Sequence, residues 1–233
     1  MFAFMSPAMR DQVLPPDAQF EPRTWVDRLV CPAGDLPQQW KRIEKKRSLE
    51  TYEVQCAGEE PFLVDLDAWK PAPGPPVRYR QLPADSYPTF VEAMKHFGQK
   101  EPEAALGKLE VAIAQSPDEP VYRRERAYLL FTLERAPEAF MEADELVRAH
   151  PDALAWKYRA LAARDLGDPL EVVRSLDGVL ASCTPKHPLY AEAVCAKGLV
   201  LSNAGSEDAE PFIKRGCELS YDRCCEEMRT RAR

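Results

Sequence analysis

The sequence predicts an all-α protein, a solenoid of about four antiparallel helix pairs that follows a small N-terminal region of different character. Its clearest mark is a step of 34 residues separating Pro117, Pro151 and Pro185. Three further columns keep this step: Ala93, Ala127 and Leu161; Ala105, Ala139 and Val173; and Ala112, Leu146 and Leu180. Proline ends one helix and permits the next, and small residues at matched places let helices approach closely. An internal repeat of this kind indicates stacked supersecondary units.

Each period divides into two helices at a breaker. The breakers span residues 98–102, 134–137 and 167–169, and each ends in proline. A fourth unit follows in a shifted register, with residues 197–201 in its first helix, 203–205 in the turn and 209–219 in its second helix. Residues 221–233 then predict a polar capping helix, which the end of a solenoid requires.

The repeat length, the small residues at matched places and the closing proline together resemble the tetratricopeptide repeat (TPR) over residues 86–187. The fourth unit, with Gly198 in its first helix, is more similar to the related Sel1-like repeat. The resemblance implies a right-handed, curved stack whose first helices line the concave side. We expect the first helices of these units to depart from the ideal TPR, without its tryptophan and its Leu-Gly pair at the matching places.

A stripe on the inward side of the first helices provides the candidate binding site. Steps of 34 residues along these helices select Tyr87, Phe90, Met94, Phe97, Arg124, Tyr128, Phe131, Tyr158, Ala162 and Asp165. Aromatic residues and arginine dominate binding energy at protein interfaces. The stripe therefore predicts capture of a protein or peptide segment through apolar contacts, with Arg124 as an anchor. The alternative is that part of the stripe packs between hairpins.

Two further features bear on the partner. Arg123, Arg124 and Arg126 form a basic cluster that is either part of the binding face or simply solvated. TPR proteins that bind chaperone tails hold the terminal carboxylate with a clamp of Lys, Asn and Arg. Phe90 and Met94 stand where that clamp would begin, so we do not expect a chaperone tail. A homo-oligomer or a multiprotein complex is compatible with such a scaffold.

The N-terminal region does not follow the repeat. Proline-rich residues 71–82 predict a linker between an α+β region at 1–70 and the repeats at 83–233. Alternation or short apolar runs predict two or three strands at 48–56, 61–67 and 77–82, while residues 36–46, which include Trp40, predict a charged helix. We expect residues 1–22 to be disordered or ordered by a partner. The region is interpreted as a cap on the first hairpin, with a second binding module as the alternative.

Seven cysteines are many for a chain of this length. Cys217-Glu-Leu, followed by a cysteine eight residues after the first, is similar to exported cysteine-rich Sel1-like proteins, and the resemblance implies a Cys217–Cys225 disulfide. Cys183 and Cys195 flank a turn and form a second possible pair, and Cys31 and Cys56 a third, which leaves Cys224 over. Three bridges indicate an oxidising compartment such as a cell envelope, whereas buried free thiols indicate the cytoplasm. Both interpretations stay open, as does a lost leader, because the chain as given shows no export signal.

Other function classes find little support. The net charge of −7 disfavours nucleic acid and anionic membranes, and no apolar run is long enough to span a bilayer. No nucleophile motif, phosphate loop or dinucleotide fingerprint is present, so we expect no catalysis and no cofactor. No two cysteines are two residues apart and the three histidines are scattered, which disfavours a metal site. A protein-binding scaffold is the leading hypothesis, and a disulfide-linked component of a cell-envelope secretion or motility assembly is the alternative.

Overall fold

A computed structural model describes residues 22–32, 36–46, 49–67 and 80–231, which form two compact units. One unit is centred on the N-terminal strands, and the other comprises the helices from residue 82 onward. The proposed arm at 1–21 and most of the proposed linker at 71–82 lie outside the described residues.

The N-terminal unit is built on a three-stranded antiparallel sheet. Its elements are α2 (Pro22–Asp27), β1 (Leu29–Val30), β2 (Gln39–Lys46), β3 (Leu49–Gln55), β4 (Phe62–Asp67) and β5 (Arg80–Gln81). The sheet order is β2-β3-β4, while β1 pairs with β5. The buried core of this unit includes Trp25, Tyr52, Val54 and Leu66. A disulfide joins Cys31, which directly follows β1, to Cys56, which directly follows β3.

The predicted helix over residues 36–46 is wrong, because residues 39–46 form strand β2. Trp40 packs edge-on against Tyr52 of β3, with ring centroids 5.6 Å apart, and anchors the strand to the core. The charged residues find partners across the strands rather than along a helix: Lys41 lies 2.9 Å from Glu53, and Lys45 lies 2.6 Å from Glu50. Cross-strand pairs of this kind stabilise a sheet. Tertiary pairing has therefore outweighed the helix propensity of lysine and glutamate.

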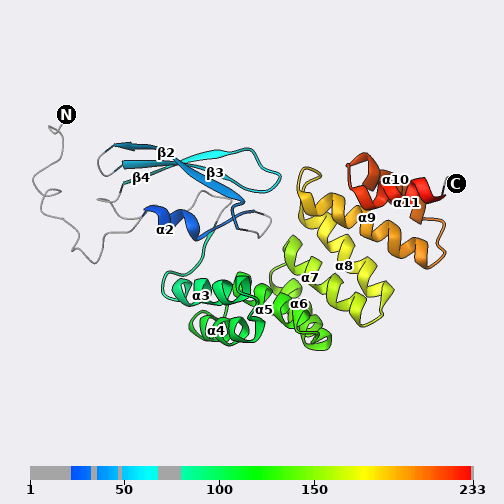
Figure 1. The fold of residues 1–233 in the computed structure, drawn as a ribbon, viewed down its shortest axis with the longest axis horizontal. Coiled ribbons are helices and arrows are strands. Elements are labelled where there is room, and N and C mark those ends of the chain that lie inside the picture. The colour runs from blue at the N-terminus through cyan, green and yellow to red at the C-terminus, as the bar shows by residue number, and fades with distance from the viewer. Residues whose placement is uncertain (1–21, 33–35, 47–48, 68–79, 232–233) are drawn as a thin grey trace, which may run out of the picture. The chain divides into compact units, whose positions relative to one another are not determined.

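The second unit consists of paired antiparallel helices, as predicted, and Figure 1 shows them as successive hairpins. The first hairpin is α3 (Tyr87–Gly98) and α4 (Pro102–Gln115), and the second is α5 (Pro120–Thr132) and α6 (Ala136–Ala149). The third is α7 (Ala153–Asp165) and α8 (Pro169–Ser182), and the fourth is α9 (Pro188–Asn203) and α10 (Ala209–Glu218). Helix α11 (Asp222–Arg231) follows them.

Proline and acidic side chains mark the beginnings of these helices. Proline occupies the first turn of α4, α5, α8 and α9, where the missing amide proton has no intrahelical role. Asp152 accepts a hydrogen bond from the Ala155 amide at 2.8 Å and caps α7, and Asp168 accepts from the Leu170 and Glu171 amides and caps α8. These caps fix the start of each helix of the third hairpin.

The first helices of the hairpins end in the same way. A residue with positive φ follows each of them: Lys100, Glu134, Gly167 and Gly205, with φ between 60° and 74°. The amide of each donates to the carbonyl three residues earlier, and the next amide donates to the carbonyl five residues earlier. This left-handed cap satisfies carbonyls at the helix end. The four caps give a structural register that does not depend on sequence spacing.

Small residues set the distance between helices. Ala93, Ala105, Ala127 and Ala139 from the repeat columns are buried. Gly178 on α8 lies beneath Trp156 on α7, and a Cβ atom there would meet the indole ring at 2.2 Å. The two helices of the third hairpin can reach this separation only because the position lacks a side chain.

Candidate protein-binding face

Four aromatic side chains from three consecutive first helices form one cluster, called here the aromatic ladder. It comprises Phe97 of α3, Tyr128 and Phe131 of α5, and Tyr158 of α7. The Tyr128 ring stacks on Tyr158 at 4.9 Å between centroids and meets Phe97 edge-on at 5.7 Å. Phe131 stacks beside Tyr128 at 6.3 Å. All four side chains are partly exposed, so the ladder both joins the hairpins and offers apolar surface to solvent.

Two positively charged groups approach the ladder in different ways. The Arg164 guanidinium lies 5.7 Å from the Phe131 ring centroid, an arrangement that permits cation–π attraction, and its side chain stays exposed. Arg124 is only 1% exposed, and its charge acts on the Tyr158 hydroxyl of the ladder. Burial raises the pKa of the Tyr158 hydroxyl, and the nearby Glu125 carboxylate raises it further, so this hydroxyl stays protonated.

Arg124 is therefore not the anchor for a partner that the sequence suggested. Its guanidinium lies 3.0 Å from Glu125 and 3.5 Å from Asp152, the residue that caps α7. Burial opposes its charge, but the two carboxylates outweigh burial and raise the pKa of Arg124. A charge so deeply buried and so paired links α5 to α7 within the protein.

The rest of the basic cluster is also engaged inside the second hairpin. Arg123 lies 2.7 Å from Glu142 and 2.9 Å from Glu145 on α6, and Arg126 pairs with the same Glu142. The sequence left two interpretations of this cluster, a part of the binding face or a solvated surface. Neither describes it fully, since Arg123 and Arg126 join α5 to α6.

Phe90 also packs inside the protein. Its side chain is 3% exposed and stacks on Tyr122 at 4.8 Å. Tyr87 is partly buried one turn away, with its ring 6.5 Å from that of Phe90, and Met94 is partly exposed on the same helix. The alternative that part of the stripe packs between hairpins holds for Phe90.

The four helix caps show that two candidates on α7 do not occupy the places that Tyr128 and Phe131 occupy on α5. Glu134 and Gly167 are 33 residues apart, whereas Lys100 and Glu134 are 34 apart. Counted back from the caps, Phe131 therefore corresponds to Arg164, not Asp165, and Tyr128 corresponds to Leu161, not Ala162. Asp165 is exposed and paired with Arg164 at 2.8 Å, and Ala162 is fully buried. Gly167 in the breaker was the signal in the sequence that could have revealed this shift.

A pocket of about 270 Å³ lies among α7, α8 and α9 and was missed by the sequence analysis. Its apolar lining includes Leu161, Val172, Leu176, Leu189, Leu199 and Val200. The polar lining includes Lys157, Arg164 and Glu192, together with Tyr221 just before α11 and Arg223 in its first turn. Spacing along one helix could not identify this site, because its lining comes from two hairpins and the capping helix.

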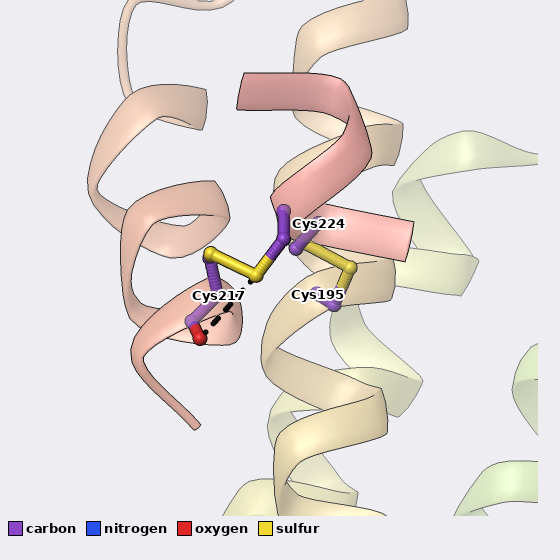
Figure 2. Close-up of a disulfide and its surroundings, with 4 residues drawn as sticks. Cys195, Cys217 and Cys224 are labelled. Carbon is purple, nitrogen blue, oxygen red and sulfur yellow. Dashed lines mark hydrogen bonds between the residues drawn. A yellow bond between two sulfur atoms is a disulfide. The ribbon is translucent and has the colours of Figure 1, made fainter. Parts of the chain in front are cut away.

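Three disulfides occur in the structure: Cys31–Cys56, Cys195–Cys224 and Cys217–Cys225. The first and third are pairs named from the sequence, but the expected Cys183–Cys195 pair is replaced by Cys195–Cys224. Figure 2 shows how Cys195 of α9, Cys217 of α10 and Cys224 of α11 come together. The Cys183 thiol, just after the end of α8, instead donates a hydrogen bond to the Val179 carbonyl of that helix at 3.2 Å. Two cysteines on either side of a turn therefore did not predict the pairing, which depends on how α11 packs against α9.

Among the described residues, no three His, Cys, Asp or Glu side chains are grouped as metal ligands. Within the same part of the chain, no helix combines the length and the apolar character needed to cross a membrane.

Comparisons with solved structures give the fold of the helical unit. MamA is similar with a TM-score of 0.54 and 12% identity, over 60% of this chain and 80% of that one. MamA residues 41–end from Desulfovibrio magneticus RS-1 give 0.53 and 13%, over 59% and 77%. A tetratricopeptide repeat protein from Parabacteroides merdae gives 0.50 and 16%, over 57% and 52%. No protein-family model and no curated protein matches the sequence.

These likenesses show that the helical unit has the TPR fold. Repeat proteins of this architecture generally present extended concave surfaces for binding. The likeness of the fourth unit to Sel1-like repeats stays a prediction.

Proposed function

We propose that this protein is a non-catalytic scaffold that binds a segment of a partner protein along the first helices of its hairpins. The observation that carries the proposal is the aromatic ladder of Phe97, Tyr128, Phe131 and Tyr158, which runs over three hairpins and stays partly exposed. Aromatic side chains that are already held in place lose little conformational entropy on binding and provide large apolar contacts. The ion pair between Arg124 and Asp152 and the burial of Phe90 support the proposal, because both hold rigidly the helices that carry the ladder.

Phe131 offers the sharpest test, because it lies at the side of the ladder, whereas Tyr128 is packed between neighbours. We expect Phe131→Ala to lower recovery of the partner on co-purification from the native host by about tenfold, the effect of losing one hot-spot residue. Met141→Ala on α6, where the side chain is 63% exposed, is the matched control. Circular dichroism should show the same helix content in both variants. Undiminished recovery with Phe131→Ala would exclude the ladder as the binding face.

The disulfides support a second candidate, a structural component of a cell-envelope assembly for secretion or motility. Six of the seven cysteines are paired. Disulfides persist in oxidising compartments and are rare in the cytosol, so we place the protein outside the cytosol in this version. Alkylation of protein from its native host before reduction, followed by mass spectrometry, should label Cys183 alone. Labelling of all seven cysteines would rule out this candidate and leave the scaffold intact.

A further inference from the structure

We infer that the pocket among α7, α8 and α9 takes one large apolar side chain of the bound segment and holds an adjacent carboxylate against Arg164 and Arg223. This inference rests on the proposed function and names the chemistry of the partner, an acidic segment with an embedded aromatic or branched apolar residue.

The size and lining of the pocket favour a side chain as the occupant. Its volume of about 270 Å³ lies just below the roughly 300–1,000 Å³ of small-molecule sites, so it suits one or two side chains better than a whole cofactor. Leu161 of α7, Leu176 of α8 and Leu189 of α9 converge on it. An aromatic or branched apolar side chain gains most from leaving water in such a space.

The pocket continues the series of positions to which Tyr128 of the ladder belongs. Leu161 and Leu199 stand six residues before the caps at Gly167 and Gly205, as Tyr128 does before Glu134. Arg164 both lines the pocket and lies over Phe131 of the ladder. One extended segment can therefore contact the ladder and the pocket in succession.

The charges at the rim of the pocket determine which kind of residue should lie next to the apolar side chain of the partner. Lys157 and Glu192 face each other at 2.8 Å and largely neutralise one another. Arg164 is paired only with the exposed Asp165 beside it, and Arg223 is exposed and forms no salt bridge with any residue that the structure describes. On a chain whose net charge is −7, this rim is locally positive. Arginine binds carboxylates through two parallel hydrogen bonds, which makes an acidic residue the matching neighbour.

Helix α11 completes the wall of the pocket. Tyr221 and Arg223 line it, and Cys224, the next residue, is bonded to Cys195 of α9, which also lines it (Figure 2). Burial raises the pKa of the Tyr221 hydroxyl, as does the Glu192 carboxylate, while Arg223 lowers it, so both charged groups lie near this hydroxyl. The disulfide holds Arg223 where a carboxylate entering the pocket would meet it.

The first experiment measures fluorescence anisotropy with a labelled peptide, Gly-Ser-Asp-Glu-Phe-Asp-Glu-Ser-Gly. Two comparison peptides replace Phe by Ser, or all four acidic residues by Lys. We expect the parent peptide to bind at least about tenfold more tightly than either comparison peptide, the factor lost with one well-made contact. Equal affinity for the three peptides, or no binding of any, overturns the inference.

Variants of the protein locate the contact. Ala196→Phe fills the pocket from α9, and Arg223→Glu reverses the rim charge; each should weaken the parent peptide about tenfold. Arg229→Glu makes the same charge change on α11, outside the pocket lining, and should leave affinity unchanged. Since Ala196→Phe alters packing, its circular dichroism is compared with that of Arg223→Glu, which changes an exposed side chain.

The same variants separate this inference from the proposed function. If the native partner is retained by Ala196→Phe and Arg223→Glu but lost with Phe131→Ala, the pocket is not used and the scaffold proposal stands. If Phe131→Ala retains the partner and the pocket variants lose it, the ladder is not the binding face.

Discussion

The first three hairpins and the C-terminal end of the helical unit are held together by different chemistry. Within and between the hairpins of α3–α8, buried arginines and stacked rings join neighbouring helices. Arg159 of α7, for example, lies 2.8 Å from Asp144 of α6 and 2.7 Å from Glu171 of α8. At α9–α11, two disulfides tie the capping helix to α9 and to α10. A terminal repeat has a neighbour on one side only and buries less surface. Covalent links there offset the missing neighbour.

The largest expected effect breaks the C-terminal linkage. Cys195→Ala combined with Cys224→Ala should lower the free energy of unfolding of α9–α11 by about 3.5 kcal/mol, the chain-entropy value for a separation of 29 residues. Hydrogen exchange of α10 and α11 amides under non-reducing conditions measures the loss. Cys183→Ala is the control, because Cys183 is in none of the disulfides. Unchanged exchange in the double variant would show that packing alone secures α11.

The second effect breaks the polar linkage. Arg159 is 9% exposed, donates to Asp144, Ser175 and Glu171, and lies 4.6 Å from the Phe140 ring centroid. Arg159→Met leaves two carboxylates without their buried partner and should cost about 2 kcal/mol in urea unfolding.

Arg174→Met serves as the matched control for Arg159→Met. Its guanidinium pairs with the same Glu171, but the side chain is 71% exposed, so the cost should stay below about 0.5 kcal/mol. Equal costs for the two variants would mean that burial of Arg159 contributes nothing.

The smallest effect appears with pH. The hydrogen bond from Arg159 lowers the pKa of Glu171 below its ordinary value of 4.5, against an opposing effect of burial. A carboxyl group whose pKa is lower in the folded state stabilises the fold above the ordinary pKa and loses that contribution as the pH falls below it. Unfolding of α7–α8 measured from pH 7 to pH 3 should therefore depend less on pH in Glu171→Gln. An identical pH profile in the variant would contradict this role.

The repeat was predictable because helix pairs leave local marks. The ends of helices favour proline, as at Pro117, Pro151 and Pro185, and close contacts between helices favour alanine. Both preferences can be recognised from the sequence alone. The register of α7 did not follow, since one residue fewer before Gly167 puts Leu161 and Arg164 at the places that Tyr128 and Phe131 occupy on α5. Strand β2 and the Cys195–Cys224 pair were missed for a related reason: both depend on a neighbour distant in sequence.

The Cys195–Cys224 bond also closes a covalent ring around the exposed α9–α10 turn near Gly205. A protease that cuts this turn severs the backbone but releases nothing, because both sides of the cut remain joined through sulfur. In gel electrophoresis the nicked chain migrates as one species until the disulfide is reduced. At this end of the protein, cutting the backbone therefore does not by itself remove α11 from the wall of the pocket.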